Sequence, residues 1–144
     1  MYLLDTNVIS ELRKTKPHEA VLKWFHSIQT HHIAIPAIVA GEIQEGIEIT
    51  RKQDPHKAFQ IEGWLEGVLE SFNVIPMDAV VFREWARMMA GKSDDLSGDA
   101  MIAATARIHR LTVVTRNVKD FEEFGVQIFN PFLDTAGEIS GESV

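Results

Sequence analysis

Residues 98–114, GDAMIAATARIHRLTVV, decide the fold class of this 144-residue chain. Over residues 99–109 the segment is apolar on almost every side of a helical projection, which predicts a centrally buried helix. Residues 111–114 follow as a short apolar run rich in β-branched side chains and predict a strand. The segment therefore predicts one buried helix that leads directly into one buried strand.

The rest of the chain repeats this alternation. Further strands are predicted at residues 2–4, 32–35, 74–76 and 126–129, and further helices from about residue 8 and over 17–28, 36–49, 59–72 and 79–90. Short strands separated by helices are typical of a parallel sheet with helices on both faces. We expect an α/β fold with one domain over residues 1–134 and a flexible tail at 135–144, which is rich in Gly, Ser and Glu.

The composition excludes several classes of function. The chain has no cysteine, so disulfides, thiolate zinc sites and thiol catalysis are excluded, and the cytoplasm is the expected compartment. No segment approaches the roughly 20 apolar residues that span a bilayer, and the first residues predict a strand, not a targeting leader. The formal net charge of -7 argues against broad attraction to phosphate backbones. Any contact with nucleic acid must therefore be local.

Asp5 directly follows the first predicted strand. In open α/β sheets ligands bind beyond the carboxyl ends of the strands, so Asp5 lies where a site is expected. Aspartate is also a good helix cap, and capping explains this residue equally well when it is considered alone. Thr6 and Asn7 offer further capping side chains for a helix that we expect to begin near Val8.

Glu42 lies within the helix predicted over residues 36–49. With about 3.6 residues per turn, it shares a helical face with Ile38, Gly46 and Ile49. A glutamate that only meets solvent avoids an apolar face. We therefore expect the Glu42 carboxylate to point toward the interior.

Asp99 stands in the first turn of the buried helix, where the helix dipole and a cap at Ser97 give it a structural explanation. Its own face, however, holds the small apolar side chains of Ile102, Ala103 and Ala106. These leave the carboxylate desolvated unless a cation compensates its charge. A divalent metal would supply that compensation.

Polar residues also follow the strand at 111–114, namely Thr115, Arg116, Asn117 and Asp120. Taken singly, each is more typical of an exposed turn than of a site. Together with the other acids they would bring several oxygen ligands to one rim of the sheet. Carboxylates that converge without a cation repel one another, whereas magnesium accepts one or two of them together with waters and phosphate oxygens. The pattern predicts a magnesium site that activates water for attack on phosphorus.

Four segments resemble the PIN-domain nucleases in order and spacing: LLDTNVISE (3–11), AIVAGEIQEG (37–46), GDAMIAATA (98–106) and VVTRNVKDF (113–121). The chain is most similar to the toxin branch of bacterial type II toxin–antitoxin pairs, the VapC and FitB group. This resemblance covers nearly the whole chain. It implies a three-layer α/β/α sandwich with a central parallel sheet and endonucleolytic cleavage of RNA.

The resemblance also assigns a metal site. Asp5, Glu42 and Asp99 would form an acidic triad around Mg²⁺ or Mn²⁺. Asp5 and Asp99 would be the principal ligands. Glu42 would bind the metal directly or through water and would orient or deprotonate the attacking water.

A fourth acidic position completes the family pattern. Asp120 would fill it, with polar contacts from Thr115 and Asn117. Some relatives carry aspartate where this chain has Asn117, so the choice between Asn117 and Asp120 stays open. Arg116 and Thr6 are the expected substrate contacts.

Partners follow from the same resemblance. The family implies an RNA substrate, a homodimer, and inhibition by a small cognate antitoxin that inserts a basic side chain into the acidic pocket. DNA would be bound only through the antitoxin, and no membrane is involved. An acidic toxin is consistent with this division of roles.

Three alternative functions compete with this assignment. The first is a toxin-like binding module that acts mainly through a DNA-binding antitoxin and has little nuclease activity, but its acids are intact. The second is a phosphoacceptor receiver domain, whose late-strand lysine is replaced here by Thr115-Arg116. The third is a haloacid-type phosphotransferase, which needs a second aspartate where the chain has Asn7.

Overall fold

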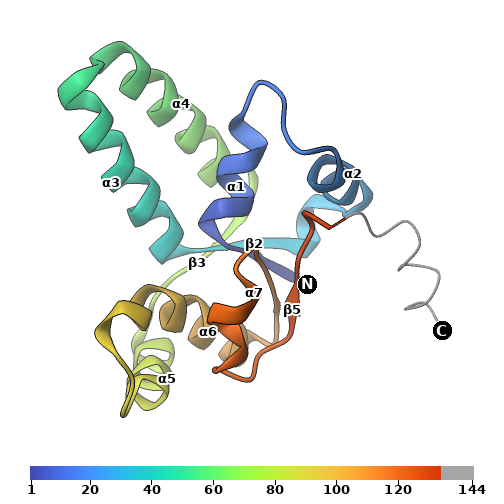
Figure 1. The fold of residues 1–144 in the computed structure, drawn as a ribbon, viewed down its shortest axis with the longest axis vertical. Helices are drawn as coiled ribbons and strands as arrows, with labels where there is room; N and C mark the ends of the chain where they lie inside the picture. Colours follow the sequence, from blue (N-terminus) through green and yellow to red (C-terminus); the bar gives the residue numbers. More distant parts are fainter. Residues whose placement is uncertain (134–144) are drawn as a thin grey trace.

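The computed structural model describes residues 1–133, and the tail predicted at residues 135–144 lies outside them. Five strands form one parallel sheet in the order β3-β2-β1-β4-β5 (Figure 1). The strands are β1 (Tyr2–Leu4), β2 (Ile33–Pro36), β3 (Asn73–Ile75), β4 (Thr112–Val114) and β5 (Ile128–Phe129). The predicted parallel sheet is therefore confirmed.

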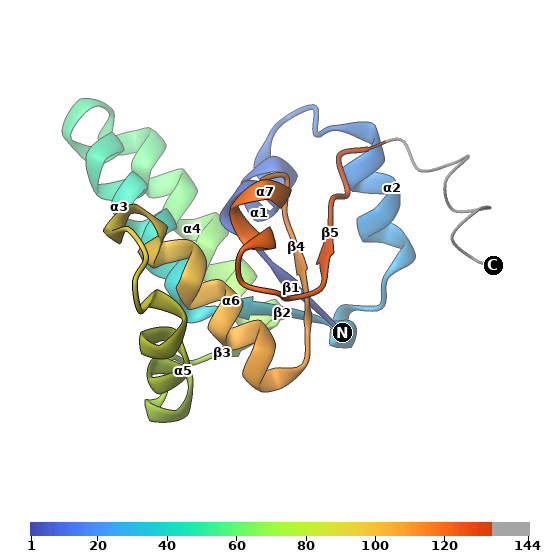
Figure 2. The ribbon, with the colours of Figure 1, turned by 60° about the horizontal axis from the view of Figure 1, so that its bottom comes forward.

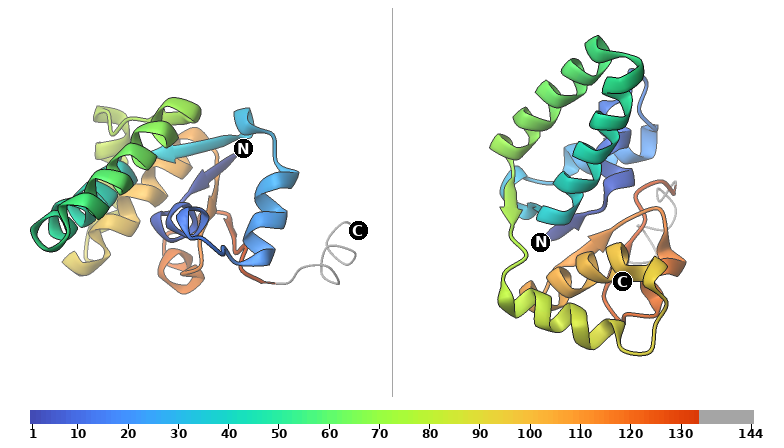
Figure 3. Two further views of the ribbon diagram at one scale, coloured as in Figure 1. Left: turned by 90° about the horizontal axis from the view of Figure 1, so that it is seen from above. Right: turned by 90° about the vertical axis from the view of Figure 1, so that its left-hand side faces the viewer.

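Helices cover both faces of this sheet. On one side are α1 (Thr6–Arg13), α2 (Glu19–Ser27), α3 (Ala37–Gln53) and α4 (Pro55–Ser71). On the other are α5 (Ala79–Met89), α6 (Ser97–His109) and α7 (Val118–Glu122). The chain also contains two short 3-10 helices, η1 (Thr30–His32) and η2 (Asp94–Leu96). The right-hand view of Figure 3 separates the two helical layers, which confirms the three-layer α/β/α sandwich.

The strand order reverses between β1 and β4. From β1 the chain moves outward through β2 to β3, and it then returns to place β4 and β5 on the other side of β1. Leu4 pairs with Val114, and the Asp5 N–H donates to the Val114 carbonyl at 3.0 Å. Ligands of doubly wound sheets bind at such a switch point, beyond the carboxyl ends of the strands. Asp5 and the residues after β4 meet there.

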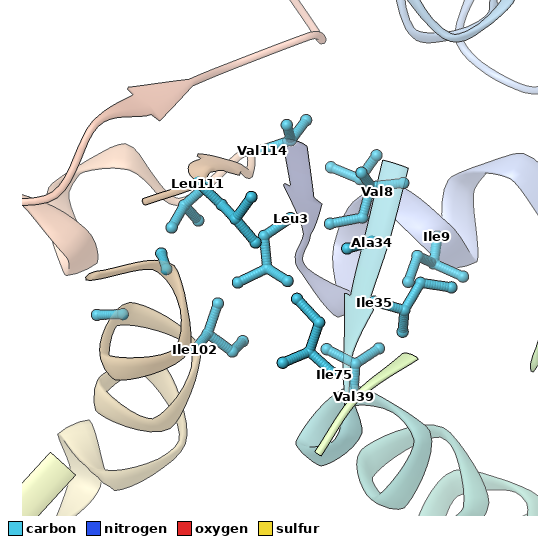
Figure 4. Packing of buried hydrophobic residues seen from close by; sticks show 14 of the residues in the cluster. Leu3, Val8, Ile9, Ala34, Ile35, Val39, Ile75, Ile102, Leu111 and Val114 are labelled. Carbon is cyan, nitrogen blue, oxygen red and sulfur yellow. The ribbon is translucent and has the colours of Figure 1, made fainter. Parts of the chain in front are cut away.

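The core joins the sheet to both helical layers. Leu3 of β1 lies centrally, with Ile102 of α6 on one side and Ile35 of β2 on the other (Figure 4). In α6 the side chains from Ala100 to Ala106, except Met101, are buried. The helix predicted to be central is therefore central, and it fixes the position of Asp99 one turn before its buried middle.

Two predicted caps differ from the structure. Helix α1 begins at Thr6, not near Val8, because the Asp5 carboxylate itself accepts the Thr6 N–H and serves as the N-cap. Ser97 is not a cap, since α6 already begins there and follows Leu96, which makes no side-chain cap bond. The η2 turn runs directly into α6, so backbone geometry starts this helix.

The α3–α4 hairpin extends beyond the sheet, alongside α1 (Figures 1 and 2). Pro55 stands in the first turn of α4, and the Asp54 carboxylate accepts the Lys57 N–H at 3.1 Å, which caps this helix. None of the helices within residues 1–133 has both the length and the apolar character needed to cross a membrane.

Candidate active site

Asp5 directly follows β1 and is buried, with 5% of the residue exposed. Its Oδ1 accepts the Thr6 N–H at 2.7 Å, and its Oδ2 accepts the Thr115 hydroxyl at 2.8 Å and the Asn7 amide at 3.2 Å. Burial raises the pKa of Asp5, hydrogen bonds from these three residues oppose the rise, and the charge of Asp120 adds to it. Hydrogen bonds therefore fix the orientation of the carboxylate, while burial and the Asp120 charge disfavour its ionised form.

Thr115 and Asn7 connect the two strand ends. The fully buried Thr115 hydroxyl accepts the Asn7 amide at 3.3 Å and the Asn117 N–H at 3.0 Å, while Asn7 Oδ1 accepts the Arg116 N–H at 3.1 Å. From the sequence Asn7 is interpreted only as a capping residue. In the structure its side chain joins α1 to the loop after β4 through hydrogen bonds with Thr115 and Arg116. The LLDTN segment already contained this residue, but only the pairing of β1 with β4 shows its partners.

The predicted orientation of Glu42 is wrong. The side chains of α3 that are buried are those of Val39, Ile43 and Ile47. Ile49, which shares the predicted apolar face with Glu42, is 59% exposed. The sheet and the packed helix α4 cover a neighbouring stripe of α3, so Glu42 lies outside the core.

Glu42 instead faces the rim next to Asp5. Its Oε1 accepts the Thr6 hydroxyl at 2.7 Å, and a Cβ placed on Gly98 would lie 3.5 Å from its Oε2. Partial burial raises the pKa of Glu42, the Thr6 hydrogen bond opposes this, and the charges of Asp5 and Glu45 add to the rise. The carboxylate is thus close to the first turn of α6, where Asp99 lies.

Asp99 is half-buried and carries the strongest electrostatic signal of the site. Burial raises its pKa to about 6, and the neighbouring charges of Asp5, Asp120 and Glu42 contribute in that order. The charges of the other three predicted acids therefore all raise the pKa of Asp99. The tertiary structure brings the four acids together from the end of β1 and from α3, α6 and α7.

Asp120 and Asn117 differ in what they bring to this group. Asp120 stands in the first turn of α7 and contributes a charge that raises the pKa values of Asp5 and Asp99. Asn117 precedes α7 without a side-chain cap bond, and its N–H donates to Thr115. Both are exposed, and the charge comes from Asp120 alone.

The backbone of Arg116 lies beside the acidic group, where its N–H bonds Asn7, but its side chain extends over the Phe132 ring. The guanidinium carbon lies 4.1 Å from the centre of the Phe132 ring. Its charge also contributes to lowering the pKa of the buried Glu11, after the larger effects of the Lys14 and His18 hydrogen bonds. In this conformation the side chain is directed toward Phe132 and Glu11.

The donor chemistry of the acidic group fits a hard divalent cation. Its side chains offer only oxygen ligands, and their mutual repulsion is what a bound cation relieves. Within residues 1–133, no three His, Cys, Asp or Glu side chains already converge closely enough to hold an ion. Bound magnesium commonly keeps several waters and contacts few carboxylates directly. The acidic group therefore fits a partly hydrated Mg²⁺ better than a cation enclosed entirely by protein ligands.

Comparisons with known proteins agree with this architecture. The PIN domain pattern matches residues 2–126. The chain is 36% identical to VapC ribonuclease Y4jK of Sinorhizobium fredii, over 92% of this chain and 98% of that protein. It is 32% identical to Toxin FitB of Neisseria gonorrhoeae, over 93% of this chain and 100% of that protein. A solved structure of FitAB bound to an IR36 DNA fragment superposes with a TM-score of 0.81 at 32% identity, covering 92% of this chain and 96% of that one.

Proposed function

The chain belongs to the PIN domain family, and on this premise we propose that it is a magnesium-dependent endoribonuclease, the toxin of a toxin–antitoxin pair. The observation that carries the proposal is the placement of four carboxylates at one rim of the sheet, where burial and then the charges of Asp5, Asp120 and Glu42 raise the pKa of Asp99 to about 6. Relatives named as a VapC ribonuclease and as Toxin FitB support the activity and the biological role.

In the proposed site Asp5 and Asp99 hold Mg²⁺ or Mn²⁺, and Glu42 binds it directly or through water. The bound cation would make a water molecule more acidic and neutralise charge on the phosphate. Thr115, Thr6 and Asn7 keep the Asp5 carboxylate in one orientation through their hydrogen bonds.

Glu42 is the proposed proton acceptor. Thr6 holds its Oε1, so Oε2, beside Gly98, is the oxygen that takes the proton from the attacking water. The water oxygen then bonds to phosphorus while the bond to the leaving ribose oxygen breaks, and the leaving oxygen takes a proton from solvent water. Partial burial raises the pKa of Glu42 and makes it a stronger base near neutral pH. Asp120 is the proposed fourth acid, because it adds charge to the group.

We also propose a cognate antitoxin as partner, with DNA bound through that antitoxin, and a homodimeric toxin. The solved FitAB structure that resembles this chain is a complex bound to DNA. An acidic chain of net charge -7 has little affinity of its own for DNA. Co-purification with the protein encoded next to it, followed by sedimentation with and without promoter DNA, tests both assignments.

The nuclease assignment is tested with purified chain and end-labelled RNA in Mg²⁺ or Mn²⁺. We expect cleavage that EDTA stops and that Asp5→Asn or Asp99→Asn abolishes, while Asp95→Asn, in the exposed η2 turn, retains it. Cleavage at wild-type rates by the first two variants would exclude this site. No cleavage by any form, with antitoxin binding retained, would favour the binding-module alternative.

A further inference from the structure

A groove with both charged and apolar side chains runs from the acidic group along α1 toward the start of α4. A hollow of about 240 Å³ begins at Thr6 and Glu42 and is lined further along by Arg13 and Trp64. A second hollow of about 510 Å³ shares Arg13, Ile61 and Trp64 with the first and extends to Lys57. Because they share these wall residues, the two hollows adjoin each other in the groove between α1 and the α3–α4 hairpin.

The outer part of this groove carries uncommitted positive charge. Arg13 and Lys57 are exposed, and neither takes part in the ion pairs formed within residues 1–133. Asp54 also lines the outer hollow, where it accepts the Lys57 backbone N–H as the α4 cap, so Arg13 and Lys57 outweigh its single negative charge there. In a chain with a net charge of -7, this is a local site for phosphates leading to the acidic end.

The groove also offers an apolar wall. The half-buried side chains of Trp64 and Ile61 line both hollows. Single-stranded nucleic acid combines a charged backbone with flat bases, and proteins bind it with basic grooves that contain aromatic surfaces. A folded DNA or RNA duplex, by contrast, would present phosphates without exposing base faces to Trp64.

We propose that this groove binds the single-stranded RNA that flanks the scissile phosphate, with Arg13 and Lys57 contacting its phosphates and Trp64 its bases. This inference rests on the proposed nuclease function and names the part of the substrate that the chain holds. The RNA leaves the acidic site past Thr6, follows α1 to Arg13, and reaches Lys57 in the first turn of α4.

The test measures binding of a fluorescein-labelled, mixed-sequence single-stranded RNA to the Asp5→Asn chain over a range of salt concentrations. Each lost phosphate contact lowers the dependence of log affinity on log salt by about 0.7, so Arg13→Gln/Lys57→Gln should lower it by about 1.4. The charge-matched control is Lys23→Gln/Arg83→Gln, in which both exposed residues lie on α2 and α5, outside the groove. The charge-retaining pair Arg13→Lys/Lys57→Arg should keep the original dependence.

Three results would overturn the groove assignment. The salt dependence could be unchanged in Arg13→Gln/Lys57→Gln, or it could fall equally in the control pair. Alternatively, Arg13→Gln/Lys57→Gln could lose antitoxin capture while its RNA binding stays intact. The last would make the groove a protein-docking surface. Cleavage by the otherwise wild-type chain is measured in parallel. Cleavage with an unaltered salt dependence rejects the groove alone, whereas absence of both cleavage and RNA binding rejects the proposed function as well.

Discussion

The Thr115 hydroxyl donates a 2.8 Å hydrogen bond to Asp5 Oδ2 although the two residues are 110 positions apart. The contact exists because β1 pairs with β4, which places Asp5 beside the residue that follows Val114. Thr115 is fully buried, and its hydroxyl also accepts hydrogen bonds from Asn7 and Asn117. One hydroxyl thus orients the central acid and joins it to the loop after β4.

Thr115→Val should impair both stability and activity. Loss of the hydroxyl leaves buried polar groups without a partner, which costs about 1–3 kcal/mol in the free energy of unfolding. It also removes a hydrogen bond that lowers the pKa of Asp5, so the acidic limb of the pH–rate profile should move to higher pH. Urea unfolding and cleavage rates measure the two effects. Thr112→Val, whose exposed hydroxyl bonds Gln127, is the control and should alter neither.

Asp99→Asn should stabilise the metal-free chain at pH 7. Folding raises the pKa of Asp99 from 3.8 to about 6, so between these values the folded chain binds more protons than the unfolded one. Stability from this group is therefore present below about pH 4 and is lost as pH rises through 6. In EDTA we expect the variant to melt a few degrees higher at pH 7, with little difference at pH 4.

Added Mg²⁺ should reverse that order. A cation that binds only the folded site raises the melting temperature of the wild-type chain, and loss of a carboxylate ligand weakens the effect in Asp99→Asn. Asp95→Asn should follow the wild type in both conditions. A wild-type melting temperature that does not respond to Mg²⁺ or Mn²⁺ would contradict the proposed metal site.

Glu42→Gln should lower the cleavage rate about 100-fold or more, because a positioned general base contributes about that much. Glu45→Gln is the matched control: it lies on the same helix and near Glu42, but the Thr6 hydrogen bond goes to Glu42 alone. Single-turnover cleavage at saturating enzyme measures the chemical step. Equal losses in the two variants would indicate a general charge effect and not a base at Glu42.

Glu84→Gln should destabilise the fold without touching the acidic group. The buried Glu84 accepts hydrogen bonds from Arg87 and Arg107 at 2.9 Å, and Arg107 also donates to the Phe124 carbonyl, which ties α5 to α6 and to the end of α7. We expect a loss of about 1.5–3 kcal/mol, as for hydrogen bonds to charged groups. Glu48→Gln, which breaks an exposed pair with Arg51, should cost less than about 1 kcal/mol in the same urea titration.

The effect of Glu84 should also depend on pH. Burial raises its pKa, but the hydrogen bonds and charges of Arg87 and Arg107 outweigh this, so folding lowers the pKa below 4.5. Its stabilising contribution is therefore present above pH 4.5 and is lost on further acidification. Wild type and Glu84→Gln should converge in stability below that pH, and a constant difference would contradict the assignment.

Helical periodicity alone could not orient Glu42. The pattern of α3 has two overlapping apolar stripes, one through Ile38 and Ile49 and one through Val39 and Ile43, and both satisfy a spacing near 3.6. Which stripe is buried depends on where the sheet and α4 contact the helix. Glu42 lies near the other acids, as the resemblance implies, but its side chain is exposed and does not point into the interior as the helical projection predicts.

By itself the sequence determined the alternation of strands and helices, the buried character of α6, and the positions of Asp5 and Asp99 at a strand end and a first helical turn, because these follow from local patterns of apolar and capping residues. Only the tertiary structure decided that β4 lies beside β1, and with it that Thr115 and Asn7 hold Asp5 and that the charges of three other acids act on Asp99. Strand order depends on long-range packing between segments, and pKa values depend on burial and on distances across them, neither of which a local pattern contains.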